Sequence, residues 1–383
     1  MKKVLCYCLS LAMLSSSASA TSVQKEDIIT ISSINITEFE DVRYITDEEL
    51  DESTDYEEYS NYIHEGGIIV VKHETLDPVM IGNELGMALE FETFNTEDLE
   101  TQVSKSGHTI PLSITVATLY YEYGNGKKGS YRVNVSANNL DKVDYVIDNV
   151  INEIHKRQNN YEEATTVMSV DDESVYATHL NTLDTVNYCS PKGTLNASYK
   201  LYSLEDYMGE DFYIIKARYD GTPGCVLADS SNESVAEDFD SQYQGEWLYT
   251  SIETPTTSVA VDDYGPESTV NSTSYSVDIS GSIDTSKVLG FSTGFNWSRS
   301  ISDVDITANR YSDCAEWDLD LSWAAHTRTI TFEPGVTFDC PTGKTYLYFD
   351  VYAAYTTDSL LSLEEDIVID ERIRCTISSA VFY

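Results

Sequence analysis

Two glycine-rich motifs in this 383-residue sequence have the spacing of known catalytic and cofactor sites. Gly290-Phe291-Ser292-Thr293-Gly294 follows the G-x-S-x-G pattern of a hydrolase nucleophile, and residues 124–129, GNGKKG, follow the G-x-G-x-x-G pattern of a dinucleotide-binding loop. Both chemistries need a helix directly after the glycines. Alternating, strand-like segments follow instead, FNWSRSI and SYRVNV. We therefore interpret Ser292 as one polar position of a strand and predict that the protein is not an enzyme.

Other residues that could support catalysis or bind a metal show little specific spacing. Asp303 and His326 follow Ser292 in the order of a hydrolase triad, but 65 acidic residues make such an order uninformative. No H-E-x-x-H pattern supports a zinc hydrolase. Carboxylate pairs offer oxygen ligands to calcium, without a complete calcium-loop spacing: Asp262 with Asp263, Asp303 with Asp305, and Asp318 with Asp320. We predict no cofactor and leave calcium open.

Residues 1–20 have the pattern of a cleavable secretory signal. Lys2 and Lys3 precede the apolar run VLCYCLSLAML, and Ala18-Ser19-Ala20 ends the segment as an A-x-A cleavage site. The predicted location is therefore secreted, or extracellular. The formal net charge of -42 repels nucleic acid and anionic lipid headgroups. The 28 tyrosines argue against a disordered acidic chain.

Cysteines after the predicted cleavage site lie only in the second half of the chain. They are Cys189, Cys225, Cys314, Cys340 and Cys375. None forms a C-x-x-C pair, so zinc and thioredoxin-type sites have no support. In an oxidising compartment, two disulfides and one remaining thiol are expected, and the sequence does not assign their pairing.

The pattern of elements predicts a mainly β fold, with a small N-terminal α+β region followed by a β-sandwich-like domain. An acidic leading arm begins the first domain, 21–165, which also contains a hairpin turning at Asn125-Gly126 and a helix within 140–158. Residues 166–172 form the predicted linker. Short alternating segments separated by Gly, Pro, Asp and Asn then fill the β-rich domain, 173–383.

Residues 274–302 alternate almost without error and are predicted to form a β-hairpin. Because strand side chains alternate in direction, the two arms have two chemically distinct faces. The apolar face carries Tyr275, Val277, Ile279, Ile283, Leu289, Phe291, Phe295, Trp297 and Ile301, with Arg299 as its discordant member. The polar face carries Ser274, Ser276, Asp278, Ser280, Ser282, Ser292, Asn296, Ser298 and Ser300.

The polar face of this hairpin is almost uncharged, which is unusual in so acidic a chain. A strand face in contact with solvent should carry many of the 65 acids, yet Asp278 is the only one. Small, neutral polar residues opposite apolar ones suit a membrane β-hairpin, whose arms need ~9–11 residues each. The apolar side chains would face lipid and the polar ones would line a pore.

The hairpin resembles the Ser/Thr/Gly-rich stem hairpins of secreted β-barrel pore-forming toxins, of the leukocidin/haemolysin and aerolysin-like groups. This resemblance implies assembly of a homo-oligomer on a host membrane or a cell-surface receptor, each subunit contributing one hairpin. The alternative is a secreted or cell-surface β-sandwich that binds glycan, protein or calcium and forms no pore. Nucleic acid is not an expected partner of either.

Overall fold

The computed structural model describes residues 39–46, 49–50, 54–73, 79–92, 112–123, 126–164, 178–205, 210–281, 293–341, 344–359 and 365–377. The chain divides into two units, Met1–Ser33 and Ile34–Tyr383, and every described residue belongs to the second. The predicted signal peptide, 1–20, lies outside the described residues. Of the described residues, 58% lie in strands and 16% in helices, which confirms the prediction of a mainly β protein.

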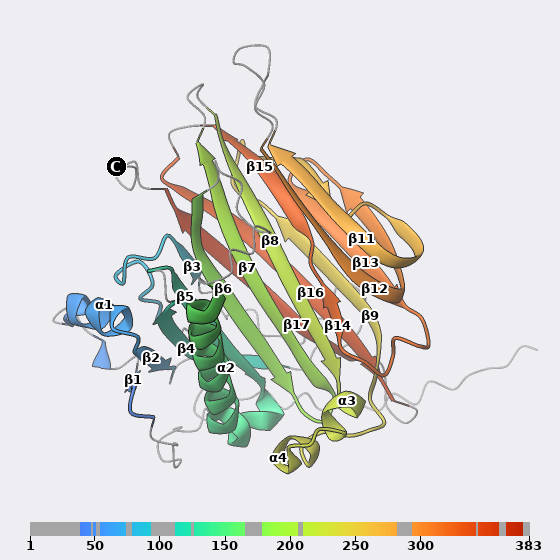
Figure 1. Cartoon of the computed structure of the whole chain (residues 1–383), viewed down its shortest axis with the longest axis horizontal. Coiled ribbons are helices and arrows are strands. Elements are labelled where there is room, and N and C mark those ends of the chain that lie inside the picture. The colour runs from blue at the N-terminus through green and yellow to red at the C-terminus, as the bar shows by residue number, and fades with distance from the viewer. Residues whose placement is uncertain are drawn as a thin grey trace, which may run out of the picture. The chain divides into compact units, whose positions relative to one another are not determined.

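Two sheets contain the strands of the described residues (Figure 1). Sheet A runs in the order β1 (Val42–Thr46), β2 (Ile68–Lys72), β4 (Ser113–Glu122), β5 (Lys128–Ser136), β6 (Thr178–Cys189), β7 (Gly193–Glu205), β8 (Glu210–Pro223), β15 (Gly335–Pro341) and β10 (Ala260–Gly265), and β14 (Ile330–Phe332) also pairs with β8. Sheet B runs in the order β11 (Thr269–Gly281), β12 (Thr293–Arg310), β13 (Cys314–Leu321), β9 (Gln244–Glu253), β16 (Tyr346–Asp358), β17 (Glu365–Thr376) and β3 (Leu89–Glu92).

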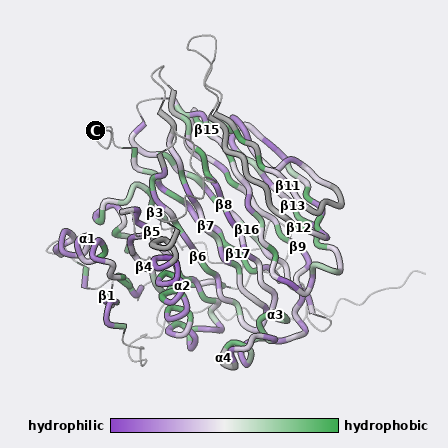
Figure 2. Tube along the Cα trace, in the orientation of Figure 1, coloured by the Kyte–Doolittle hydropathy of each residue, from purple (hydrophilic) through white to green (hydrophobic). Residues whose placement is uncertain are grey.

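The inner faces of both sheets contribute to one hydrophobic core. Figure 2 shows hydrophobic and hydrophilic residues alternating along many of these strands, as a sheet with one buried face requires. Phe338 of β15 and Phe349 of β16 meet with their ring centroids 5.1 Å apart. Tyr355 packs so closely on β8 that a Cβ atom at Gly221 would lie 2.8 Å from its ring. A larger residue at this position would push the two sheets apart.

The predicted helix and hairpin of the N-terminal region are both present. Helix α2 (Val143–Ala164) buries Val143, Val146, Ile147, Val150 and Ile154 on one face, and a 3₁₀ turn, Ala137–Lys142, precedes it. Strands β4 and β5 pair antiparallel around Gly126, whose φ of 78° favours glycine. The G-x-G-x-x-G motif therefore leads into a strand, as the sequence analysis predicts.

The acidic leading arm is more ordered than its sequence pattern suggests. It contributes β1 and helix α1 (Tyr56–His64). The Asp55 side chain caps the helix by accepting a hydrogen bond from the backbone N–H of Glu58 at 3.1 Å. Tyr59 and Ile63, four residues apart, are buried. This i, i+4 pair after an N-cap was the signal available in the sequence.

The two predicted domains share sheet A. Strand β5, from the predicted first domain, pairs parallel with β6, from the predicted second. The linker residues, 166–172, lie outside the described residues, so the domain division stays a prediction. Two short helices, α3 (Gly224–Ala228) and α4 (Glu233–Ala236), follow β8.

No disulfide joins the described cysteines in this structure, where the sequence led us to expect two. The five cysteines after residue 188 are all free and buried. Each lies on a different element, and in the strand registers their partners are other residues, such as Asp211 for Cys340 and Leu347 for Cys375. Burial first, and then the nearby Cys340 thiol, raise the pKa of the Cys375 thiol to about 12, which favours its protonated form.

Candidate functional site

Strands β11 and β12 form the antiparallel hairpin predicted from the alternation. Val277 pairs with Trp297 and Ile279 with Phe295 on one face. Ser276 pairs with Ser298 and Asp278 with Asn296 on the other. The register therefore places apolar positions opposite apolar ones and polar positions opposite polar ones, with Asp278 as the acid of the polar face. Tyr275 pairs with Arg299 at the end away from the tip.

The outer part of this hairpin is a two-stranded ribbon that extends beyond the rest of sheet B. Residues 304–310 of β12 pair with β13. In the described part of the chain, residues 293–300 of β12 pair only with residues 274–281 of β11, and these two segments form the ribbon. Between the pairs Ser272–Val304 and Ser274–Ser300, β12 contains two more residues than β11. This bulge separates the ribbon from the body of the sheet, and a bulge locally disrupts the hydrogen-bond ladder. Because β13 pairs only beyond the bulge, the pairing of residues 304–310 with β13 does not depend on the position of the ribbon.

The apolar face of the β11 arm is packed in the protein core. Tyr275, Val277 and Ile279 are 2%, 0% and 0% exposed, whereas Ser274 and Ser276 are exposed. The Tyr275 ring lies 5.6 Å from that of Phe332 on β14. A Cβ atom at Gly265, at the end of β10, would lie 3.5 Å from the Cβ of Val277. The ribbon thus lies against strands of sheet A.

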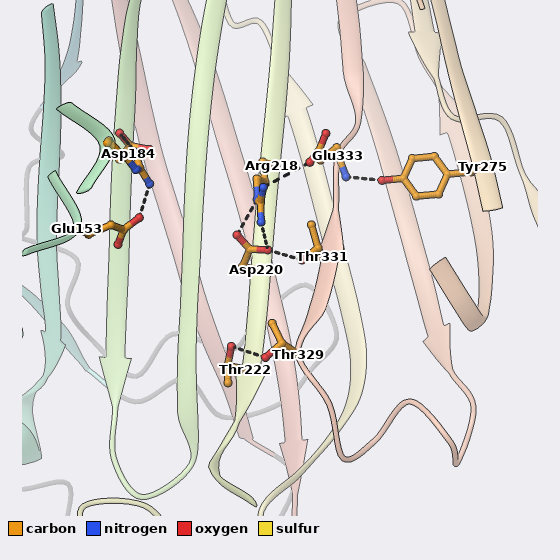
Figure 3. A network of polar contacts seen from close by, with 10 residues as sticks. Glu153, Asp184, Arg218, Asp220, Thr222, Tyr275, Thr329, Thr331 and Glu333 are labelled. Atoms are coloured by element: carbon orange, nitrogen blue, oxygen red, sulfur yellow. Dashed lines mark hydrogen bonds and ion pairs between the residues drawn. The ribbon is translucent and has the colours of Figure 1, made fainter. Parts of the chain in front are cut away.

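A polar network fixes the Tyr275 end of the ribbon to sheet A (Figure 3). The backbone N–H of Glu333 donates to the Tyr275 hydroxyl at 2.7 Å. The buried Glu333 carboxylate lies 3.7 Å from the Arg218 guanidinium. Arg218 in turn forms two hydrogen bonds with Asp220, at 2.8 and 3.1 Å, and Asp220 accepts a hydrogen bond from Thr331. This chain of contacts joins β11 to β14 and β8.

Replacing Tyr275 with Phe should loosen the ribbon without changing the shape of its apolar face. The buried N–H of Glu333 would lose its acceptor, at a cost of about 1–3 kcal/mol in the free energy of unfolding. We expect denaturant unfolding to show this loss and the ribbon to be more easily cut by protease. Tyr355→Phe is the matched control, because the Tyr355 hydroxyl is buried and has no hydrogen-bond partner among the described residues. Equal losses in the two variants would contradict a specific role for Tyr275.

The loop between β13 and β14 holds the base of the ribbon and exposes a tryptophan. Arg328 donates to the Ser302 hydroxyl at 2.9 Å and lies 3.4 Å from the Asp303 carboxylate. The φ of Asp303 is 64°, a left-handed conformation at the bulge. Trp323 in the same loop is 80% exposed. The sequence analysis did not single out this residue, although its neutral surroundings, SWAAHT, contrast with the acidic chain.

Several predicted hairpin residues lie outside the described residues. These are Ile283, Leu289, Phe291, Ser282 and Ser292. For Asp278, Ser280, Phe295, Asn296, Trp297, Ser298 and Ser300 the strand pairing is described. Ile301 is buried. Membrane-facing and pore-lining roles for both groups stay predictions.

The residues considered for catalysis and metal binding have other partners. Asp303 contacts Arg328, and the His326 ring Nε2 lies 2.9 Å from the backbone carbonyl of Leu321. Asp318 accepts a hydrogen bond from the Trp247 indole N–H. In the described part of the chain, no three His, Cys, Asp or Glu side chains are grouped to hold a metal ion. No helix in these ranges is long and apolar enough to span a bilayer.

Comparison with known proteins finds similarity in structure alone. No family model matches the sequence, and no curated protein matches it. A solved structure described as a pore forming protein matches with 7% identity and a TM-score of 0.32, covering 50% of this chain and 88% of that one. Clostridium perfringens delta-toxin matches with 11% identity and a TM-score of 0.31, covering 54% and 99%.

A third match is the Clostridium perfringens NetB toxin in its membrane-inserted form. The identity is 6% and the TM-score 0.25, with 50% of this chain and 94% of that chain covered. These structures are leukocidin-like β-pore-forming toxins, the group that the hairpin resembles. With TM-scores below 0.5, the matches carry no inference about what this chain does. Any functional inference rests on the ribbon and its surroundings.

Proposed function

We propose that this protein is a secreted, non-enzymatic pore-forming protein whose residues 274–302 leave the core and insert into a membrane. The observation that carries the proposal is the register of β11 and β12. It gives the ribbon one face of apolar positions, with Arg299 at its end, and one face of small polar positions whose acid is Asp278, in a chain with 65 acids. Several copies contribute one hairpin each to a shared barrel, because a single hairpin would leave unpaired strand edges in lipid.

The position of Arg299 is compatible with insertion. Arg299 pairs with Tyr275, next to the bulge and away from the hairpin tip. In an inserted hairpin this end lies near the membrane surface, where an arginine costs ~0–1 kcal/mol, in contrast to ~2–4 kcal/mol at the midplane. Tyr275 at the same level suits the aromatic girdle of a membrane barrel. The charged residue on the lipid face is therefore where it is best tolerated.

Release of a trapped dye tests the proposed function. The purified protein is added to vesicles of phosphatidylcholine and cholesterol, to vesicles with anionic lipid, and to red cells. We expect release from the neutral vesicles or the red cells, and less from anionic vesicles because the net charge is -42. Absence of release from every membrane would contradict pore formation and favour a β-sandwich that only binds its partner.

Trp323 is the residue that we expect to contact the membrane surface first. Its indole is exposed on a loop that Arg328 joins to the base of the ribbon, and indoles favour the membrane–water interface. Trp323→Ser should weaken binding to phosphatidylcholine vesicles by about tenfold, measured by co-sedimentation. The folding stability should not change, because the side chain is 80% exposed.

Tyr311→Ser is the control for this experiment. Tyr311 is also an exposed aromatic residue, at 52%, but follows the other end of β12. An equal loss of vesicle binding in both variants would show that general surface hydrophobicity, and not the Trp323 loop, makes the contact.

A further inference from the structure

A second cluster of aromatic residues lies on the outer face of sheet B, separate from the core between the sheets. Trp247 and Tyr249 of β9 stack with their ring centroids 5.6 Å apart, and Tyr352 of β16 meets Tyr249 edge-on at 5.9 Å. Ala354 and Val368 complete the cluster. The described apolar side chains that pack on Tyr352, Ala354 and Val368 are those of Trp247 and Tyr249.

Carboxylates flank these rings on the neighbouring strand. In the register of β13 with β9, Asp318 is opposite Tyr249 and Asp320 is opposite Trp247, while Glu316 is opposite Ser251. Strand β12 adds Asp305 directly opposite Asp320, although like charges in this position repel each other. On the other side of the cluster, the guanidinium of Arg372 is held by Asp350 at 2.6 and 2.7 Å. The β13 and β12 side of the cluster therefore carries four carboxylates.

The aromatic and acidic groups are coupled to each other. The Trp247 indole N–H donates to the Asp318 carboxylate, which fixes the position of both groups. Burial, and the nearby Asp320 carboxylate, raise the pKa of Asp318, against the lowering effect of the indole N–H. Burial first, and then the Glu316 carboxylate, raise the pKa of the Tyr249 hydroxyl. An added positive charge would stabilise each of these groups in its ionised form.

We propose that this face, through Trp247, Tyr249, Glu316, Asp318 and Asp320, binds a cationic segment of a partner protein by its arginine or lysine side chains. Aromatic ring faces and carboxylates both attract these cations. Charge complementarity favours a cationic segment of a partner over the surface of a second copy of this chain, whose net charge is -42. The binding surface is independent of the proposed membrane insertion, so either proposal can fail without the other.

Binding of a labelled oligo-arginine peptide tests this surface. Fluorescence anisotropy is measured at about 0.15 M salt, where screening over ~8 Å reduces the contribution of distant charges. Trp247→Leu keeps the net charge and should weaken binding by about three- to thirtyfold. Asp318→Asn keeps an acceptor for the indole N–H and should weaken binding to a similar degree. Circular dichroism confirms that each variant is folded, and dye release from vesicles should stay at the wild-type level.

Glu237→Gln is the charge control, because Glu237 is exposed and lies beyond α4, on another part of the chain. It removes the same charge as Asp318→Asn and should leave peptide binding unchanged. The proposal is overturned if Trp247→Leu binds like the wild type. It is also overturned if Glu237→Gln and Asp318→Asn weaken binding equally, since the peptide would then respond only to net charge.

Discussion

A disulfide between positions 265 and 277 should abolish dye release from vesicles, and a reducing agent should restore it. The variant Gly265→Cys/Val277→Cys joins the end of β10 to the middle of β11. The two Cβ atoms would be 3.5 Å apart, within the range of a disulfide. If the ribbon must leave sheet A to insert, a covalent bond to β10 prevents it. Release should fall to the background of vesicles alone.

The same protein before and after reduction is the main control for this experiment. Val277→Cys alone shows whether the smaller side chain, and not the cross-link, changes the activity. The native thiols should not interfere, because all five are buried. Wild-type release by the oxidised double variant would contradict insertion of residues 274–302. The protein would then permeabilise membranes with another segment.

A lysine at position 276 should change the ion selectivity of the pore. Ser276 is exposed here and pairs with Ser298 on the polar face, so a longer side chain does not disturb the core. In the assembled barrel each subunit would add one positive charge to the lumen, where substitutions alter selectivity. We expect the reversal potential across a planar bilayer, measured under a salt gradient, to shift toward anion selectivity. The unfolding free energy should change by no more than about 0.5 kcal/mol.

Thr307→Lys is the matched control for Ser276→Lys. Thr307 is also exposed, but it belongs to the part of β12 that pairs with β13 and lies beyond the bulge. The net charge changes equally in the two variants. A change of selectivity in Thr307→Lys, or none in Ser276→Lys, would contradict the assignment of the polar face to a pore lumen.

The disulfide and the lysine substitution distinguish pore formation from binding by a static β-sandwich. A static β-sandwich also buries Tyr275, Val277 and Ile279, so burial by itself is compatible with both. The disulfide tests whether the ribbon moves, and the lysine tests what its polar face contacts after the movement. A protein that binds a partner without forming a pore would show neither effect.

Local patterns in the sequence predicted individual strands and helices, because the period of each is visible within a few residues. The period of two in residues 274–302 predicted both faces of the ribbon, and the register of β11 and β12 has the same faces. The helical spacing from Val143 to Ile154 predicted α2. The arm that contains α1 was interpreted as unpatterned, because many acidic residues surround the two buried positions, Tyr59 and Ile63.

Contacts between distant segments were not available from the sequence. The cysteines were expected to pair because of the predicted compartment, but their strands place other residues beside them. The contacts of Tyr275 with Glu333 and of Glu333 with Arg218 each join residues more than fifty positions apart. The role proposed for Trp323 depends on the contact between its loop and the base of the ribbon, which joins Arg328 to Ser302.

The sequence by itself determined that one hairpin has an apolar face and an almost uncharged polar face, because alternation along a strand is a local property. It also determined that Ser292 is followed by a strand pattern and not by a helix. Only the tertiary structure decided that Tyr275, Val277 and Ile279 pack against sheet A, and that residues 293–300 pair with β11 alone among the described residues. Burial and pairing depend on segments far away in the chain, which the period of a single strand does not encode.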